Sequence, residues 1–223
     1  MPRSQAARQP LSPPSPSSLY KRTADRLDLS AEQQAQLETY VGLLGKWQPK
    51  VNLIGPSTWP DVWDRHVVDS LQCLDHVPEE LQPEGRGCAD IGTGAGFPGI
   101  VVAIATERPV TLVESDQRKA AFQLAVKTAT GAPLTTTTRR VEALPPEPID
   151  VLFARAFAPL PRLLEWCAPL IDAETCLILH KGRTAAEEIS AAAETHHFES
   201  ESFPSLIDSD SVILRLRNVR PRR

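Results

Sequence analysis

The sequence predicts an α/β fold with a mostly parallel, doubly wound sheet, an antiparallel edge strand and an N-terminal helical extension. From residue 87 onward, short apolar strand segments alternate with amphipathic helical segments, which is the pattern of a parallel sheet covered on both faces. The last two strand segments, "HHFESES" and "SVILRLR", have no helix between them, so we expect an antiparallel hairpin at one edge. A glycine-rich window, "ADIGTGAGFPGI", joins the first strand of the alternation to its first helix.

Composition limits the class of protein. The 223 residues are 41% hydrophobic and 5% aromatic, which is ordinary for a soluble globular protein. No apolar run approaches the length of a membrane span, and the N-terminus lacks the apolar core of a signal peptide, so we expect a cytoplasmic protein. The cysteines show no C-x-x-C pairing, so we expect reduced thiols and no metal site; they are Cys73, Cys88, Cys167 and Cys176.

Charge is unevenly distributed along the chain. The formal net charge is -4, which argues against an avid general nucleic-acid binder. Both ends are nevertheless basic, and the C-terminus reads "RLRNVRPRR". Basic tails often contact phosphate backbones, although tails that serve only solubility are the plainer interpretation from composition alone.

Four segments are expected along the chain. Residues 1–18 are rich in Pro, Ser and Arg, and we predict them to be disordered. Residues 19–84 form the predicted helical extension, and residues 85–219 form the predicted sheet domain. Residues 220–223 are a short basic tail.

The helical extension contains two expected helices. Ser30 and Gln33 form a capping box that begins the first helix, and Pro49 is expected to end it. Asn52 then serves as a loop cap or lines a pocket, and we favour the cap. The second helix is expected from about residue 61 to 74.

The sheet domain is expected to alternate strands and helices up to its final hairpin. Pro98 suits the first turn of the helix after the glycine window. Ser115 or Asp116 can cap the next helix, which carries Phe122, Ala125, Val126 and Ala129 on one face. The expected strands are 87–91, 110–114, 134–138, 149–154, 175–180, 196–202 and 211–217, and the expected helices are 98–106, 116–129, 161–170 and 185–194.

The glycine window fits two cofactors. Residues 94–99 spell the G-x-G-x-x-G of a dinucleotide site, and residues 90–96 spell a D-x-G-x-G-x-G. Asp90 distinguishes them, because a carboxylate would repel a pyrophosphate but suits the ammonium and sulfonium of S-adenosylmethionine (SAM). Glu114 follows the next strand, where a carboxylate can bind ribose hydroxyls of either cofactor. The window therefore favours a SAM-dependent methyltransferase over a hydride-transfer enzyme.

The segment after the fourth strand, "ARAFAPL", indicates the acceptor by what it lacks. It contains no D-P-P-Y or N-P-P-Y for an exocyclic amine and no Pro-Cys nucleophile for a cytosine ring. Guanine N7 is one acceptor that needs neither, because its lone pair is free and no proton leaves, so catalysis can rest mainly on alignment. Arg155 in this segment is suited to position a phosphate or a base edge. The alternative for Arg155 is a salt bridge to an acid such as Asp150 or Glu165.

Six stretches together resemble a known family. They are "LLGKWQPKVNLIG", "RHVVDSL", "DIGTGAGFPGI", "ESDQRKAAF", "ARAFAPLPRLLEWC" and "HKG", in the family's order between about residues 30 and 217. On these motifs the chain resembles the bacterial 16S rRNA guanine-N7 methyltransferases, the small-subunit methyltransferase G family, also called glucose-inhibited division protein B. The resemblance implies a Rossmann-like class I SAM-dependent methyltransferase fold.

The glycine motif and the resemblance together give a set of expected site residues. For the cofactor SAM these are Asp90, Gly92, Gly94, Gly96, Phe97, Glu114, Val141, Glu142 and Arg155. For orienting RNA they are Arg65, His66, Arg155 and Lys181. His66 has an alternative role in local hydrogen bonding with Asp69 or Ser70, and Lys181 has one as a solvated strand end. Glu114 stands where the family more often has Asp.

The resemblance also implies a substrate. It implies methyl transfer to N7 of a guanine in 16S rRNA, with guanine 527 of the decoding-region loop as the family target, and the small ribosomal subunit as partner. We expect a monomer with no membrane association. The alternatives are a small-molecule SAM-dependent methyltransferase and a non-catalytic ribosome-binding protein, with a dehydrogenase as a more distant one.

Overall fold

The computed structural model describes residues 9–78 and 85–222. In this part of the chain a seven-stranded sheet has the order β3-β2-β1-β4-β5-β7-β6. All neighbouring strands are parallel except that β7 runs antiparallel to β5 and β6, so the predicted edge hairpin and doubly wound sheet are confirmed. The strands are β1 Cys88–Ile91, β2 Val110–Val113, β3 Leu134–Thr137, β4 Val151–Arg155, β5 Cys176–Lys181, β6 His196–Pro204 and β7 Val212–Pro221.

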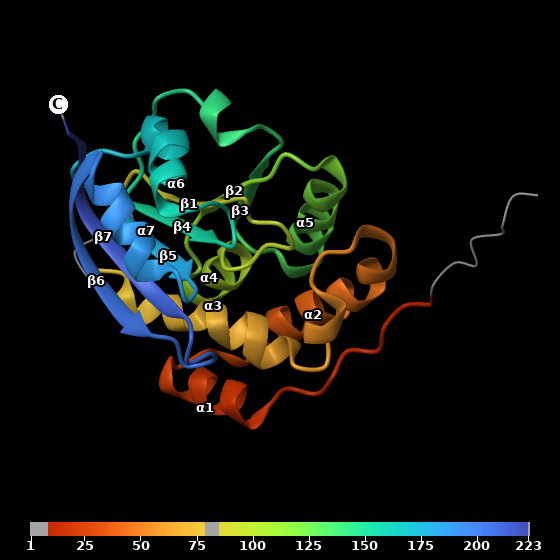
Figure 1. Ribbon diagram of the computed structural model, residues 1–223. Helices are drawn as coiled ribbons and strands as arrows, with labels where there is room; N and C mark the ends of the chain where they lie inside the picture. The colour runs from red at the N-terminus through yellow and green to blue at the C-terminus, as the bar shows by residue number, and fades with distance from the viewer. Residues whose placement is uncertain (1–8, 79–84, 223) are drawn as a thin grey trace, which may run out of the picture.

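Helices cover both faces of the sheet, and the helical extension packs beneath it (Figure 1). The α-helices are α1 Ser18–Arg26, α2 Ala31–Val51, α3 Asp69–Leu71, α4 Gly99–Thr106, α5 Gln117–Thr130, α6 Leu160–Cys167 and α7 Ala185–Ala193. Short 3₁₀ turns lie at Pro56–Thr58, Gln72–His76, Val141–Ala143 and Ala168–Leu170. Within the described ranges, no helix is both long and apolar enough to cross a membrane.

Strand β4 shows how the sheet divides the core in two. Val151 and Phe153 belong to one buried cluster, and Leu152 and Ala154 belong to the other, because side chains alternate between the faces of a strand. The first cluster includes α2, α4 and α5, and the second includes α6 and α7. The helical extension therefore shares one core with the sheet domain.

Pro49 does not end helix α2, contrary to the prediction. The helix continues to Val51, and Asn52 is its C-cap in the left-handed region (φ 52°), as favoured from the sequence. A proline in a helix leaves the carbonyl four residues earlier without its usual donor. Here that carbonyl, of Gly45, accepts a hydrogen bond of 2.9 Å from the N–H of Leu11.

Residues 9–17 are placed against the helical extension, whereas disorder was predicted for residues 1–18. Besides the bond from Leu11, the carbonyl of Pro14 accepts a 2.8 Å hydrogen bond from the indole of Trp63. Ser17 caps α1 and also donates to Asp64. The rest of the predicted disordered tail, residues 1–8, lies outside the described residues.

The second predicted helix is present but irregular. It begins as a π-helix, Trp63–Val68, and continues through α3 into the 3₁₀ turn Gln72–His76. π-Helical turns are rare and are frequently found at functional sites. This one carries Arg65 and His66.

The buried face of α5 agrees with the prediction at Phe122 and Val126 and differs at its edges. Ala129 is exposed and Ala125 is half-buried, while Gln123 is fully buried. The Gln123 amide donates a 2.9 Å hydrogen bond to the carbonyl of Gly94 in the glycine loop, and its Oε1 is buried without a partner. Asp116 caps the helix, as one of the two predicted alternatives.

Candidate active site

The glycine loop between β1 and α4 needs its glycines for two reasons. Gly92, Gly94 and Gly96 all have positive φ values, of 64°, 58° and 99°, which other residues adopt only with strain. A Cβ at Gly92 would also lie 2.3 Å from the Phe157 ring, and one at Gly96 would lie 2.2 Å from Ile100. A Cβ at Gly94 would meet nothing closer than 3.9 Å, so the middle of the loop is open to a ligand.

Asp90, near the end of β1, anchors the glycine loop through hydrogen bonds to its carboxyl group. It is fully buried, and its Oδ2 accepts hydrogen bonds from the Gly99 N–H at 2.8 Å and from the Thr93 hydroxyl. Its Oδ1 is buried without a partner. Burial raises the pKa of Asp90 to about 7, although its two hydrogen bonds oppose the rise. An orphan carboxylate oxygen beside an open glycine turn fits a cofactor that carries an ammonium group.

Glu114, after β2, is held by two backbone donors. Its Oε2 accepts from the Gly94 N–H at 2.9 Å and its Oε1 from the Asp116 N–H at 2.8 Å. These bonds fix the Glu114 side chain against the glycine loop, although it is longer than the Asp that the family more often has at this position. Each oxygen keeps a second lone pair for a ribose hydroxyl.

A cavity of about 210 Å³ lies beside this carboxylate. Four predicted cofactor residues line it, namely Gly92, Glu114, Val141 and Glu142. Phe157 and Trp166 also line it, with their ring centroids 5.7 Å apart in an edge contact. Neither ring was predicted as a site residue. A cavity lined by both a carboxylate and aromatic rings suits an adenosine group.

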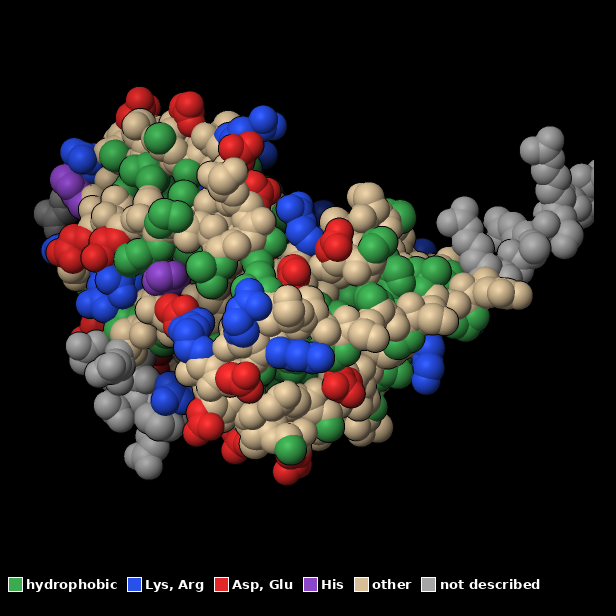
Figure 2. All heavy atoms as spheres, turned by 90° about the horizontal axis from the view of Figure 1, so that it is seen from below, with side chains coloured by type: hydrophobic (Ala, Val, Ile, Leu, Met, Phe, Trp, Pro, Cys, Tyr) green, Lys and Arg blue, Asp and Glu red, His purple; other side chains and the backbone are tan. Residues whose placement is uncertain are grey.

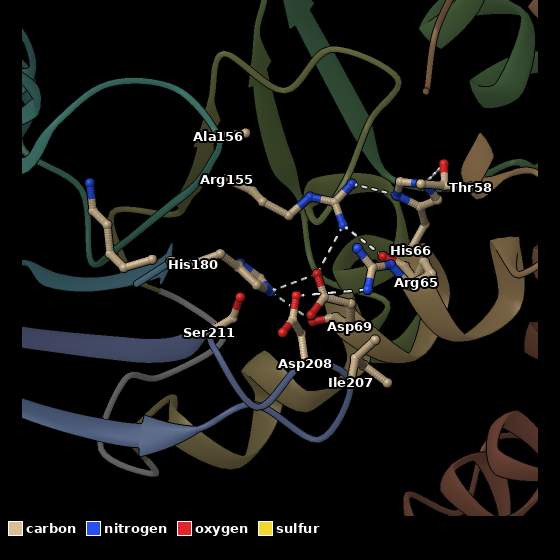
Figure 3. Close-up of a pocket in the computed structure, with 12 residues that line it drawn as sticks. Thr58, Arg65, His66, Asp69, Arg155, Ala156, His180, Ile207, Asp208 and Ser211 are labelled. Carbon is tan, nitrogen blue, oxygen red and sulfur yellow. Dashed lines mark hydrogen bonds and ion pairs between the residues drawn. The ribbon is translucent and has the colours of Figure 1, made fainter. Parts of the chain in front are cut away.

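A second cavity, of about 380 Å³, gathers all four residues predicted to orient RNA. Arg65 and His66 reach it from the π-helix and Arg155 from the end of β4 (Figure 3). Lys181 lines it from the end of β5. The two strand ends meet because the carboxyl ends of parallel strands share one edge of the sheet, and the π-helix is held to this edge by its contacts with Arg155.

Arg155 is the centre of this cavity's hydrogen-bond network. Its guanidinium donates to Asp69 Oδ2 at 2.9 Å, to His66 Nδ1 at 2.8 Å and to the Arg65 carbonyl at 3.3 Å (Figure 3). Neither acid weighed from the sequence is its partner, since Asp150 instead pairs with Arg86 at 3.1 Å. Arg155 therefore links the helical extension to the sheet.

His66 is held neutral. Burial, followed by the positive charges of Arg155 and Arg65, lowers the pKa of His66 to about 3. Its ring lies over Phe97, with 5.0 Å between ring centroids, and Arg155 lies over the same ring at 5.2 Å. Phe97 is 3% exposed and lies beneath this network, where it joins the glycine loop to the second cavity. The bond from Ser70 reaches only the backbone carbonyl of His66.

Lys181 lies in a different setting from the phosphate-binding position expected for it. The side chain is 7% exposed, and Nζ donates to the Ala158 carbonyl and to Glu188 Oε2, both at 2.8 Å. Glu188 in turn accepts from the Leu160 N–H at 2.8 Å. The ammonium thus ties the loop after β4 to α7, and its charge is compensated.

Asp69 and His180 belong to the network but were not predicted as site residues. His180 Nε2 lies 2.8 Å from the Asp69 carbonyl and 3.4 Å from its Oδ2, and burial lowers the pKa of His180. Their signal was present in the motifs "RHVVDSL" and "HKG", where Asp69 follows His66 by about one helical turn and His180 precedes Lys181.

Solved structures similar to this chain share its fold. They include an O-methyltransferase from Bacillus cereus in complex with SAH (TM-score 0.53, 14% identity, covering 90% of this chain and 97% of that one) and MtNAS in complex with MTA and tNA (TM-score 0.55, 18% identity, 89% and 81%). The fold, glycine loop and adjoining cavities define a class I SAM-dependent methyltransferase. Residues 33–212 match the family described as rRNA small subunit methyltransferase G, and the chain belongs to that family.

Curated relatives cover nearly the same length. The ribosomal RNA small subunit methyltransferase G of Gluconobacter oxydans is 41% identical over 192 residues, which are 86% of this chain and 97% of the relative. The enzyme of the same name from Paramagnetospirillum magneticum is 43% identical over 192 residues, which are 86% of this chain and 91% of the relative. The chain is accordingly an rRNA methyltransferase that uses SAM.

Proposed function

We propose that this enzyme methylates N7 of guanine 527 in the decoding-region loop of 16S rRNA. The observation that carries the choice of N7 is the state of the acids and bases around the 380 Å³ cavity. Among its described lining residues, Asp69 is paired with Arg155, Asp208 is paired with Arg65, and both imidazoles are hydrogen-bonded. No buried group among these is set up to remove a proton, which suits an acceptor atom that carries none.

The residues around the glycine loop would hold the cofactor. Asp90 and Gly94 would hold its methionine part, and Glu114 and Glu142 would accept hydrogen bonds from its adenosine part. When bound, SAM supplies a methyl group on a positively charged sulfur. Bringing the acceptor lone pair into line with that methyl is then the main task of the protein, an effect worth up to roughly 7–11 kcal/mol.

The residues of the second cavity would hold the guanosine. Arg155 and His66 are fixed against Phe97 by their own network, so they form a rigid wall between the glycine loop and the substrate. Arg65 is more accessible, with 46% of its side chain exposed, and would contact the RNA backbone.

The reaction is tested with radiolabelled SAM and small subunits that lack their native methylations. The labelled RNA is reduced with borohydride and cleaved with aniline, which cuts at N7-methylguanine. A single cut in the decoding-region loop is expected. Label without a cut would refute N7 and keep the methyltransferase. Label only on small molecules in a cell extract would favour the alternative substrate class.

Asp90→Ala tests the cofactor assignment in a binding experiment. We expect SAM affinity in titration calorimetry to fall at least tenfold. The variant also leaves the Gly99 N–H without its acceptor, at a cost of about 1–3 kcal/mol of folding stability. Thr93→Val is the matched control, because it removes one hydrogen bond to the same carboxyl group and keeps the Asp90 side chain. Equal SAM affinities in wild type and Asp90→Ala would overturn the assignment.

The proposal includes a monomer that acts in the cytoplasm, where small subunits are assembled. Light scattering of the purified enzyme, alone and with SAM, tests the monomer.

A further inference from the structure

The loop between β6 and β7, residues 205–211, forms one side of the 380 Å³ cavity. Ile207, Asp208 and Ser211 line the cavity from this loop, opposite the π-helix that carries Arg65 (Figure 3). The loop has a defined shape, since the Leu206 N–H donates to Gln72 Oε1 at 2.9 Å and the Ser211 N–H to the Asp208 carbonyl at 3.0 Å. Its carboxylates are therefore held at fixed places beside the cavity.

Two carboxylates of this loop pair with arginines from two other elements. Asp208 lies 3.7 Å from Arg65 of the π-helix, and Asp210 lies 4.0 Å from Arg183, which follows β5. Both pairs are long and solvent-exposed, with side-chain exposures of 46% and 39% in the first and 83% and 62% in the second. Exposed pairs at such distances are weak and exchange readily for another anion.

The other two cations around the cavity behave differently. Arg155 is 18% exposed and is held by Asp69 at 2.9 Å, and Lys181 is 7% exposed and is held by Glu188 at 2.8 Å. Separating either cation from its acid would leave an unpaired charge in a largely buried position, which is energetically costly. Arg65 and Arg183 are thus the cations beside this cavity that can change partner.

Bulk charge does not mark an RNA-binding face on the helical side of the molecule. Figure 2 shows basic and acidic side chains interspersed there, with no stripe of one sign. The net charge of the chain is -4. On this face, binding of a polyanion therefore depends on individual cations and on the acid with which each cation is paired.

We propose that Arg65 and Arg183 are the phosphate contacts that flank the substrate cavity, and that Asp208 and Asp210 occupy the phosphate positions until RNA displaces them. The inference rests on the rRNA substrate. A phosphate that binds Arg65 breaks its pair with Asp208 and approaches that carboxylate, and both effects oppose binding. An RNA that also fills the cavity gains enough binding free energy to offset both costs. An RNA that binds by its backbone alone does not gain this free energy. The two aspartates thereby discriminate against unrelated RNA.

Asp208→Asn tests this, with Glu174→Gln as the matched control. Glu174 pairs with Arg86 at 3.6 Å away from this cavity, where Arg86 also binds Asp150 and Asp172, so the control removes the same charge from an ion pair of similar length. The probe is a 20-nucleotide polyuridine whose dissociation constant is measured between about 50 and 300 mM salt.

We expect Asp208→Asn to bind polyuridine about 3–10-fold tighter than wild type, and its salt slope to steepen by up to about 0.7, the value for one added phosphate on a single strand. Glu174→Gln should stay within twofold. Equal changes in dissociation constant and salt slope in the two variants would mean that net charge alone causes the effect, and this would overturn the proposal.

The Arg65→Gln background distinguishes an effect of the Arg65–Asp208 ion pair from an effect of the Asp208 charge alone. There, Asp208→Asn should no longer steepen the salt slope, because the cation that it releases is absent. An undiminished change in slope would also overturn the proposal. The same pair of variants is made for Arg183 and Asp210. Failure of the subunit methylation assay would instead refute the proposed reaction, and it leaves these binding results to be judged separately.

Discussion

The guanidinium of Arg155 donates a 2.8 Å hydrogen bond to Nδ1 of His66, and this contact fixes the tautomer of the imidazole. Arginine has no acceptor, so Nδ1 must keep its lone pair and the proton must lie on Nε2. Nε2 then donates to the Thr58 hydroxyl at 2.8 Å, which donates to the Gly55 carbonyl at 2.8 Å. Each group in this series donates to the next, from Arg155 on β4 to the Gly55 carbonyl in the loop after α2. Protonation of His66 would place a proton on Nδ1 and break the hydrogen bond from Arg155.

A pH dependence of stability follows from this contact. His66 has a pKa of about 3 in the fold against 6.5 for an ordinary histidine, so between these values the unfolded chain binds one more proton. The free energy of unfolding therefore falls as pH falls from 6.5 towards 3, by up to about 1.4 kcal/mol per pH unit from this group.

Urea unfolding of wild type and His66→Gln between pH 7 and 4 measures this contribution. The variant is expected to lose stability less steeply than wild type below pH 6.5. Other titrating groups are common to both proteins, so the difference isolates His66. Parallel pH profiles would show that the histidine is free to protonate in the fold.

Gly92→Ala is expected to close the cofactor cavity. The new methyl group would meet Phe157, which lines that cavity, whereas a Cβ at Gly131 meets nothing within 4 Å. Both glycines have similar positive φ values, 64° and 71°, so both substitutions carry backbone strain of about 1–3 kcal/mol. Only Gly92→Ala should also reduce SAM affinity, at least tenfold in titration calorimetry. Similar SAM affinities in the two variants would contradict a cofactor site at this place.

Lys181→Met is expected to destabilise the fold and to leave RNA binding alone. It strands the carboxylate of Glu188, which is 19% exposed, and we expect a loss of about 2–4 kcal/mol in thermal or urea unfolding. Adding Glu188→Gln should recover part of the loss. If Lys181→Met is instead fully stable and flattens the salt dependence of RNA binding, the phosphate role expected from the sequence is correct.

Leu11→Pro and Pro49→Ala form a double-mutant cycle around the Gly45 carbonyl. Leu11→Pro removes the donor that this carbonyl uses, at an expected cost of about 1–2 kcal/mol. Pro49→Ala supplies a helical N–H to the same carbonyl. The cost of Leu11→Pro should therefore be smaller in the Pro49→Ala background, by about 1 kcal/mol in urea unfolding. Additive effects would mean that the two donors do not share this acceptor.

The sequence was most informative where chemistry follows from position in a parallel sheet. Asp90, Glu114 and Arg155 each lie at or just after the end of a strand, and such ends meet at one edge, so their convergence could be predicted from the order of strands and helices alone. The partners of these residues could not be predicted in the same way. Asp150 and Glu165 were weighed for Arg155 because they are near it in sequence, but the partner Asp69 comes from the helical extension.

The same limit explains why the pairing of Lys181 could not be predicted and why the prediction for Pro49 was wrong. The end of a strand at the substrate edge suggested a free Lys181, but α7 brings Glu188 back against it. Proline is a reliable helix terminator only where no other donor replaces the missing N–H, and the replacement here comes from Leu11. Both outcomes depend on tertiary packing that local patterns do not encode.

The hydrogen bonds of residues 9–17 have a consequence for synthesis of the chain on the ribosome. Translation delivers this segment first, but its partners Gly45, Trp63 and Asp64 emerge only later. The segment must wait unbound until the polypeptide reaches at least Asp64, and the helical extension can enclose it from then on. That point precedes the glycine loop, so the hydrogen bonds of this segment can form before any cofactor-binding residue has left the exit tunnel, whereas the apolar packing of α2 must wait for α4 and α5.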